Sequence, residues 1–172
     1  VYKRQYSRSP KVKLYLNDKL IGEKETGKEN YTATFDVPYE PGTLKAVNSK
    51  GKEEFVLKTA GEPAAIRLIA DRSKIKACKN DLSYVKIELV DKNGNVVPET
   101  SLPVKIECTG KGTVIAGGNA AYADMESFRS LTPNTFRGKA IAIVQPDGEK
   151  GDIQVKVSAK GLEDASIVIT TY

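Results

Sequence analysis

Short runs in which apolar and polar residues alternate fill most of the sequence, and this period of two restricts the fold more than any other feature. Examples are KVKLYLN (11–17), YTATFDV (31–37), YVKIELV (84–90) and DIQVKVSA (152–159). Successive side chains of a β-strand point to opposite faces, so such runs predict strands with one buried face. Helical periodicity is absent. The sequence therefore predicts an all-β fold class.

Turn signals separate these runs at intervals that are typical of β-sandwiches. Asn93 and Gly94, for example, tolerate the positive φ of a tight turn. Many short strands at this spacing favour immunoglobulin-like sandwiches. The strands fall into two series, separated by the stretch 61–63. We therefore expect two consecutive immunoglobulin-like β-sandwich domains, residues 1–60 and residues 61–172, with the first truncated at its N-terminus.

The stretch VPYEPGTLKAV (37–47) predicts a corner that leads into a strand. Pro38 and Pro41 each fix φ and lack a backbone N–H, so this segment does not fit the middle of a paired sheet. Gly42 frees the backbone for a sharp turn before the alternating pattern resumes. We expect an edge or a corner here.

Alternation also assigns the residues that face each core. Apolar residues two positions apart share one face of a strand, and we expect that face to be buried. The expected core residues are Val12, Leu14 and Leu16 in the first domain, and Val85, Ile87, Leu89, Ile141, Ile143, Val155 and Val157 in the second.

The net charge of +5 is modest and lies mainly in the first domain. Residues 1–60 carry 12 Lys and Arg against 8 Asp and Glu, a balance of +4. VYKRQYSR (1–8) mixes cations with tyrosines, as proteins that bind single-stranded nucleic acids do. The basic residues do not continue as a stripe, so we interpret this segment as a solvated strand and expect no nucleic-acid partner.

No apolar run is long enough to span a bilayer, which takes roughly 18 or more residues, and we expect no membrane partner. The N-terminal segment 1–10 also lacks the apolar core of a signal peptide. The chain opens in a predicted strand without an initiator Met. We therefore expect it to be a piece of a longer protein, with any targeting signal upstream.

Histidine is absent, and this excludes several kinds of active site. Ser-His-Asp and Cys-His arrangements need an imidazole, the one side chain whose unperturbed pKa lies near neutrality. A carboxylate pair could hydrolyse glycosides, but it needs a fixed separation across a cleft, and the β/α repeat that commonly builds such a cleft is missing. We expect no catalytic residue in these 172 positions.

The two cysteines indicate neither a metal site nor a defined disulfide. Cys78 and Cys108 do not form a Cys-x-x-Cys pair, and no His is present to complete a zinc site. Whether they pair with each other stays open, because the two side chains need not face one another. We expect no metal ion and no cofactor.

One connection, residues 117–136, is much longer than the others. Loops of more than ~12 residues in compact domains are usually functional or disordered. This one holds Asn119, Tyr122, Glu126 and Phe128. These side chains could stack on and hydrogen-bond a sugar, or they could dock a neighbouring domain. Apolar anchors are what an interdomain contact requires, so we favour docking.

Four stretches occur in an order that carries a family resemblance. They are VKLYLNDKLIGEK (12–24), FDVPYEPGTLKAV (35–47), TAGEPAAIRLIAD (59–71) and VKIELVDKNGNVVP (85–98). The first two resemble the VELFLNGKSLG strand pair and the W-x-V-P-Y-x-P-G-x-L-x-A segment of the domains that follow the catalytic barrel in glycoside hydrolase family 2 β-galactosidases. The other two resemble the opening and the first hairpin of that family's C-terminal immunoglobulin-like domain.

The resemblance implies a non-catalytic C-terminal portion of a β-galactosidase-type glycosidase that braces the catalytic barrel. The family's catalytic glutamates lie on that barrel, and no segment of this chain is similar to it. The implied partners are the upstream barrel and a β-galactoside carbohydrate, in a periplasmic or extracellular parent protein. The chain departs from the family's D-N-G-D-P-T-S-H-E-S-F pattern in the long loop, where Ala120-Ala121-Tyr122 replaces Gly-Asp-Pro.

Two other functions remain open. A carbohydrate-binding module would present a planar row of exposed aromatic rings, and the absence of Trp with only 7% aromatic residues counts against it. A cell-surface adhesion module is supported only by fold-level similarity to bacterial immunoglobulin-like domains.

Overall fold

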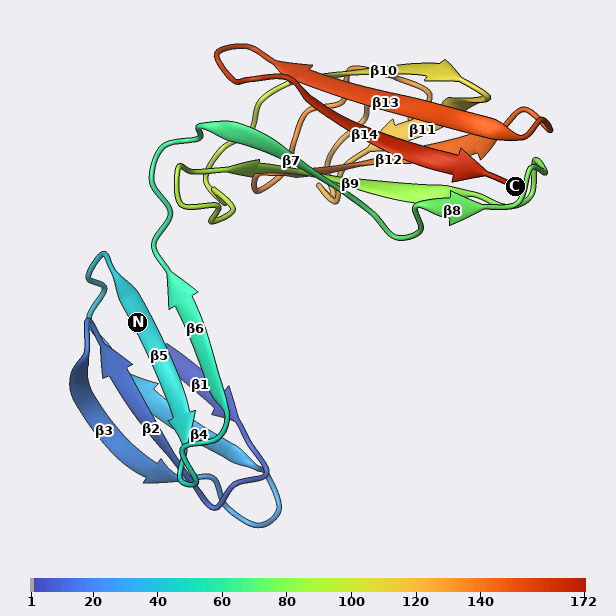
Figure 1. The fold of residues 1–172 in the computed structure, drawn as a ribbon. Helices are drawn as coiled ribbons and strands as arrows, with labels where there is room; N and C mark the ends of the chain where they lie inside the picture. Colours follow the sequence, from blue (N-terminus) through green and yellow to red (C-terminus); the bar gives the residue numbers. More distant parts are fainter. Residues whose placement is uncertain (1) are drawn as a thin grey trace. The chain divides into compact units, whose positions relative to one another are not determined.

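The computed structural model describes residues 2–172, and its regular structure consists of β-strands (Figure 1). The chain divides into two compact units, unit 1 (Val1–Thr59) and unit 2 (Ala60–Tyr172). No helix in the described part of the chain is long and apolar enough to cross a membrane. The prediction of an all-β fold class is confirmed.

Unit 1 is a small sandwich of six strands. These are β1 (Tyr2–Tyr6), β2 (Lys11–Leu16), β3 (Lys19–Glu25), β4 (Thr32–Asp36), β5 (Thr43–Asn48) and β6 (Glu54–Lys58). One antiparallel sheet has the order β3-β2-β5-β6, and β1 pairs with β4 in a second sheet. Val12, Leu14 and Leu16 are buried as expected, and they pack with Ala33 and Phe35 of β4.

The proline-rich corner lies between β4 and β5 and is tied to the β2–β3 turn. The Asn17 side chain accepts a hydrogen bond from the Thr43 N–H (2.8 Å) and donates one to the Pro41 carbonyl (3.1 Å). A side chain at Gly42 would collide with this amide, because its Cβ would lie 1.8 Å from Asn17 Oδ1. Gly42 also has a φ of +136°, which favours glycine. The Asn17 contact therefore requires glycine at position 42.

Unit 2 is a sandwich of two four-stranded sheets around a larger core. Its strands are β7 (Ala65–Ala70), β8 (Lys74–Ile75), β9 (Ser83–Val90), β10 (Val104–Gly110), β11 (Gly112–Gly118), β12 (Lys139–Pro146), β13 (Gly151–Ala159) and β14 (Ala165–Thr171). The sheet orders are β10-β13-β14-β8 and β11-β12-β9-β7. The expected core residues Val85, Ile87, Leu89, Val155 and Val157 are buried.

Strand β12 corrects the expected core. Ile141 is 38% exposed and Ile143 is only half-buried, whereas Ala142 and Val144 are buried. Because the run KAIAIV is apolar on both faces, alternation alone cannot decide which set faces inward. The pairing of Ile143 with the exposed Tyr84 of β9 places the isoleucines on the outer face of the sheet.

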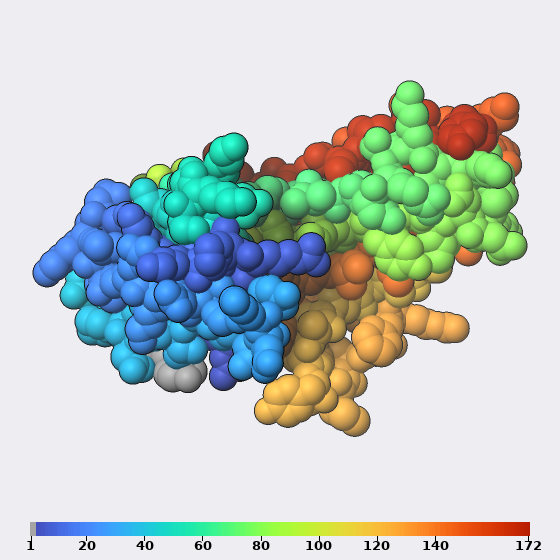
Figure 2. All heavy atoms as spheres, turned by 90° about the horizontal axis from the view of Figure 1, so that it is seen from below, coloured from blue at the N-terminus to red at the C-terminus, as the bar shows by residue number. Residues whose placement is uncertain are grey.

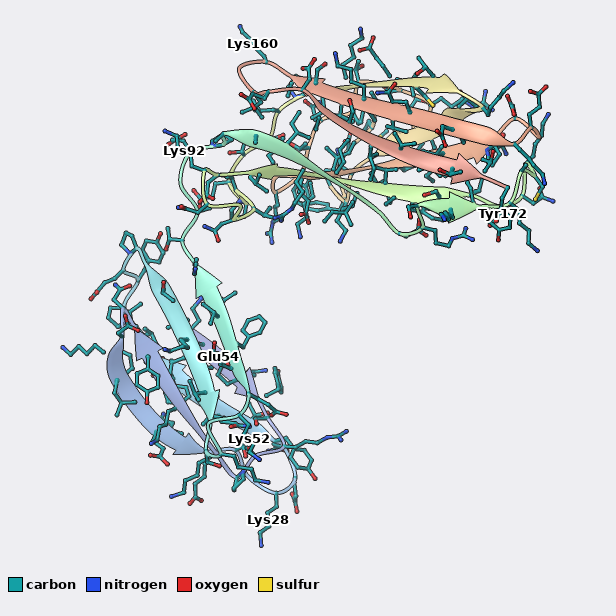
Figure 3. All side chains as sticks on the ribbon, in the orientation of Figure 1. Lys28, Lys52, Glu54, Lys92, Lys160 and Tyr172 are labelled. Atoms are coloured by element: carbon teal, nitrogen blue, oxygen red, sulfur yellow. The ribbon has the colours of Figure 1, made fainter. Side chains whose placement is uncertain are left out.

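Charged side chains extend into solvent from turns of both units. Lys28, Lys52 and Lys160 are exposed examples (Figure 3). Short ion pairs, such as Lys105 with Glu107 on strand β10 at 2.8 Å, use some of the remaining charges. Exposed pairs of this kind add little stability.

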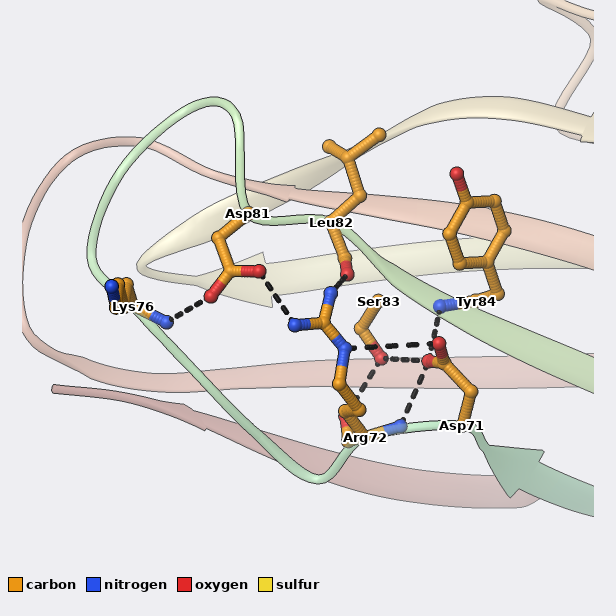
Figure 4. A network of polar contacts seen from close by, with 7 residues as sticks. All are labelled: Asp71, Arg72, Lys76, Asp81, Leu82, Ser83 and Tyr84. Carbon is orange, nitrogen blue, oxygen red and sulfur yellow. Dashed lines mark hydrogen bonds and ion pairs between the residues drawn. The ribbon is translucent and has the colours of Figure 1, made fainter.

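A polar network around Arg72 fixes the segment between β7 and β9 (Figure 4). Arg72 Nη1 donates to Asp81 Oδ1 (2.6 Å), and the guanidinium also donates to the Leu82 carbonyl. The second carboxylate oxygen of Asp81 accepts the Lys76 N–H (2.6 Å). The Lys76 N–H and the Arg72 guanidinium together hold the pKa of Asp81 below its usual value. The network thereby positions the short strand β8.

The two cysteines are free. Cys78 is exposed in the segment after β8, and Cys108 is half-buried on β10 with its Sγ 3.6 Å from the Gly112 carbonyl. Burial raises the pKa of the Cys108 thiol, which disfavours the reactive thiolate form. The disulfide that the sequence left open is thus not formed.

Asp91, at the end of β9, is the buried centre of the hairpin DKNGN. Its carboxylate accepts the Gly61 N–H (2.9 Å), the Asn95 side chain (3.0 Å) and the N–H groups of Asn93 and Asn95 (2.9 and 2.8 Å). The hydrogen bond from Gly61, followed by that from the Asn95 side chain, lowers the pKa of Asp91 to about 2. The charged carboxylate therefore holds the hairpin and the start of unit 2 together.

We predict that Asp91→Asn destabilises unit 2 at neutral pH. The substitution removes the negative charge and replaces one acceptor oxygen with an NH₂ group, which faces N–H donors and cannot accept their hydrogen bonds. A carboxyl group with a lowered pKa stabilises the fold when ionised, and this contribution is lost as the pH falls below 3.8 towards about 2. The wild-type chain should exceed the variant in melting temperature at pH 7, and the gap should close near pH 2. Calorimetry of both chains across this range is the measurement. Asp147→Asn, in an exposed turn, is the matched control, and an equal loss in it would contradict the prediction.

Candidate functional site

The connection between β11 and β12, residues 119–138, is here called the strap. β10 and β11 are edge strands of different sheets, and the strap bonds to both. The Ile106 N–H of β10 donates to the Leu131 carbonyl (2.8 Å), and the Gly117 N–H of β11 donates to the Phe128 carbonyl (2.7 Å). The strap therefore closes one side of the unit 2 sandwich and pairs backbone groups that an open edge would leave exposed.

Two adjacent glycines let the strap approach β11 closely. A Cβ on Gly117 would lie 2.8 Å from the Ser130 carbonyl oxygen, and one on Gly118 would lie 2.9 Å from the Phe128 ring. Both distances are too short for a carbon contact. The ring of Phe128 is thus placed by the lack of a side chain at Gly118.

A cluster of polar side chains holds the outer part of the strap. Asn119 Nδ2 donates to the Asn134 carbonyl (2.9 Å) and to the Asp124 carboxylate, and Asn119 Oδ1 accepts the Ala121 N–H (2.7 Å). The Asn134 side chain donates to Glu126 Oε1 (2.8 Å). Asn119 and Glu126, predicted as site residues, therefore bond within the strap itself. Among residues 2–172, no group of His, Cys, Asp or Glu side chains could hold a metal ion.

Three large apolar side chains of the strap are more than two-thirds exposed. Tyr122 is 99% exposed, Met125 95% and Phe128 70%. In Figure 2 the strap, in yellow and orange, projects from unit 2. Tyr122 and Phe128 were predicted as site residues. Met125 was missed because it belongs to no alternating run, although it is the only Met in the chain.

A shallow depression of about 30 Å³ lies between the strap and the end of β11. Asn119, Glu126 and Phe128 are among its lining residues, and Tyr122 is not. A space of this size holds only one or a few water molecules. Three of the four predicted residues are thus brought together around a depression too small to enclose a sugar ring.

Two family models match this chain. Residues 66–168 match the glycoside hydrolase family 2 C-terminal domain 5, and residues 4–55 match a domain of unknown function, DUF4982. The first match covers more than half of the chain. The chain belongs to glycoside hydrolase family 2. The resemblance carried by its sequence motifs is thereby confirmed, and unit 2 contains the family's C-terminal domain.

Relatives of this family 2 chain are much longer than it is. It is 32% identical to the β-galactosidase BoGH2A of Bacteroides ovatus, over 96% of the chain and 20% of the relative. It is 28% identical to a β-glucuronidase of Formosa agariphila, over 92% of the chain and 16% of the relative. The crystal structure of a family 2 member from Bacteroides cellulosilyticus superposes with a TM-score of 0.91 at 36% identity, over 98% of this chain and 24% of the other. The chain spans about a fifth of the length of its curated relatives.

We predict that Gly117→Ala destabilises unit 2 by about 1–3 kcal/mol, the usual cost of forcing an extra carbon into a packed site. The new Cβ meets the Ser130 carbonyl and should weaken the bond between Gly117 and the strap. Urea unfolding measures the loss. Gly61→Ala is the matched control, since its Cβ would lie 3.8 Å from Asp91, an ordinary contact. The same loss in both variants would show that close approach of the strap is not the cause.

Proposed function

We propose that this chain is a non-catalytic accessory part of a family 2 β-glycosidase and that the strap docks it onto the catalytic barrel of the parent protein. The exposure of Tyr122 and Met125 carries this proposal. Neither side chain is buried by the chain's own fold, although the strap beneath them is tied to two edge strands. Exposed apolar side chains on a fixed backbone are typical of an interface that has lost its partner.

The hydrogen bonds of the strap support docking because they order the backbone that carries the exposed apolar side chains before a partner binds. Association costs less when the binding segment is already ordered. Aromatic residues and Met are enriched at the centres of protein interfaces, where a few side chains contribute most of the binding energy. Tyr122, Met125 and Phe128 fit this description, and Arg129 beside them is exposed at the rim.

The proposed reaction of the parent protein is hydrolysis of a β-glycoside, with a β-galactoside as the first choice of substrate. Support comes from the names of two relatives, each of which is a β-galactosidase. A third relative is named a β-glucuronidase, so the sugar is the part of this proposal that needs testing first. In this proposal the 172-residue chain supplies no catalytic group to the reaction.

Direct carbohydrate binding by the strap is less well supported than docking. A sugar site needs polar groups free to bond the hydroxyls, and Asn119 and Glu126 are already bonded to other strap residues. It also needs a concave surface, and the depression beside the strap measures only about 30 Å³. The geometry therefore favours a protein partner.

We predict that Tyr122→Ser and Met125→Ser each weaken docking by about 1–3 kcal/mol, roughly tenfold in affinity for every 1.4 kcal/mol. The measurement is the affinity of the 172-residue chain for the remainder of the parent protein, produced separately. Both variants should keep the melting temperature of the isolated chain, because neither side chain is buried in it. Tyr39→Ser, on an exposed aromatic residue of unit 1, is the matched control. Unchanged affinity in both strap variants would exclude docking through this surface.

We also predict that the isolated chain neither hydrolyses a chromogenic β-galactoside nor binds galactose at millimolar concentration. Backbone amide shifts during a titration with galactose and short galactosides report the binding. Saturable shifts centred on Asn119 to Phe128 would support a sugar site. Turnover that survives repurification and is lost on mutating an acidic residue of the chain would overturn the non-catalytic assignment.

A further inference from the structure

Strand β6 of unit 1 exposes the face that should be buried. Its residues Phe55 and Leu57 pair with Ala46 and Leu44 of β5, whose side chains face the core. Phe55 is nevertheless 62% exposed and Leu57 46% exposed. Every residue of β6 is exposed, so the strand is open on both faces. An inner face left open in a sandwich marks a place where a covering element is missing.

The second sheet of unit 1 explains the exposure, because it has two strands and the first sheet has four. β4 packs against β3 and β2. Its unpaired edge faces β3, since Lys24 Nζ of β3 donates to the Thr34 carbonyl of β4 (2.6 Å). β1 pairs with the opposite edge of β4, and Figure 1 draws it behind β5 and β6. The second sheet therefore ends at β1 and leaves the inner face of β6 uncovered.

β1 is also incompletely paired. In the part of the chain that the structure describes, β4 is its only partner strand. The inner positions of β1 are Lys3 and Gln5, which pair with the buried Phe35 and Ala33 but are themselves only half-buried. An edge strand with a free side can accept a further strand by backbone hydrogen bonds.

We propose that a third strand, supplied by the polypeptide that precedes residue 1 in the parent protein, pairs with the open edge of β1 and covers Phe55 and Leu57. Such a strand would place apolar side chains at alternate positions over β6. It would complete a sheet of three strands facing the sheet of four. This strand belongs to unit 1 and is independent of the docking proposed for the strap in unit 2.

The origin of the strand is argued from length, position and charge. Curated relatives match this chain over only 16–24% of their own length, so a parent of similar size has ample additional polypeptide. β1 begins at Tyr2, and a tight turn before it would be enough to lay a preceding strand antiparallel along its free edge. A second copy fits less well, because pairing two β1 strands would bring Lys3 and Arg4 of both copies together.

The test compares the 172-residue chain with the same chain extended upstream by successive lengths of its parent sequence. Amide hydrogen exchange in β1 and β6 should slow by about tenfold or more once the extension includes the strand. Phe55→Ser and Leu57→Ser should then lower the melting temperature of unit 1 in the extended chain and have little effect in the short one. Val56→Ser is the matched control, because this side chain lies on the outer face of the same strand opposite Lys45.

Two results would overturn the proposal. One is unchanged exchange in β1 and β6 in every extended chain and in the complete parent protein. The other is a dimer of the 172-residue chain, seen by analytical ultracentrifugation, in which these two strands are already protected. The exchange measurement does not involve Tyr122, so its outcome is separate from that of the docking experiment.

Discussion

Unpaired edge strands are the constraint on which the rest of this structure depends. Each open sheet presents N–H and C=O groups along its two edges. Residues 2–172 contain no helix, so only loops and further strands of this part of the chain can pair these groups. In unit 2 one segment, the strap, pairs with two edge strands. It accepts hydrogen bonds from the N–H groups of Ile106 on β10 and Gly117 on β11. Its long connection is therefore a structural element of the sandwich. The described residues of unit 1 include no connection of comparable length, and Phe55 of β6 is left exposed.

Closing the edge also fixes the surface proposed for docking. Gly117 and Gly118 bring the strap against β11, and the hydrogen bond from Asn119 to the Asn134 carbonyl helps to hold its outer part. The backbone below Tyr122 is thus constrained, while the side chain itself touches almost nothing. The hydrogen bonds of the strap thus order its backbone and leave the Tyr122 side chain exposed. An ordered, exposed side chain lowers the cost of binding a partner.

The sequence predicted the strands well because a period of two is a local signal. It failed at β12, where Ile141 and Ala142 are both apolar and only the pairing with β9 decides which of them faces inward. It identified the long loop by its length. It did not reveal the bond between Ile106 and Leu131, because such a contact joins residues far apart in the sequence and leaves no periodic trace. Met125 was missed for a related reason, since exposure on a loop has no pattern of its own.

The departure from the family pattern in the long loop now has a physical explanation. The positions that keep the pattern include Asn119 and Glu126, and both bond to other residues of the strap. The replaced positions, Ala120-Ala121-Tyr122, end at the side chain that is 99% exposed. Substitution of these side chains leaves the scaffold intact, because the stretch contributes backbone groups of Ala121. Its N–H donates to Asn119, its carbonyl accepts the Asp124 N–H (3.3 Å), and any residue except proline supplies both groups. The bonded residues of the strap therefore preserve its shape, and the tip carries a side chain that the proposed docking uses.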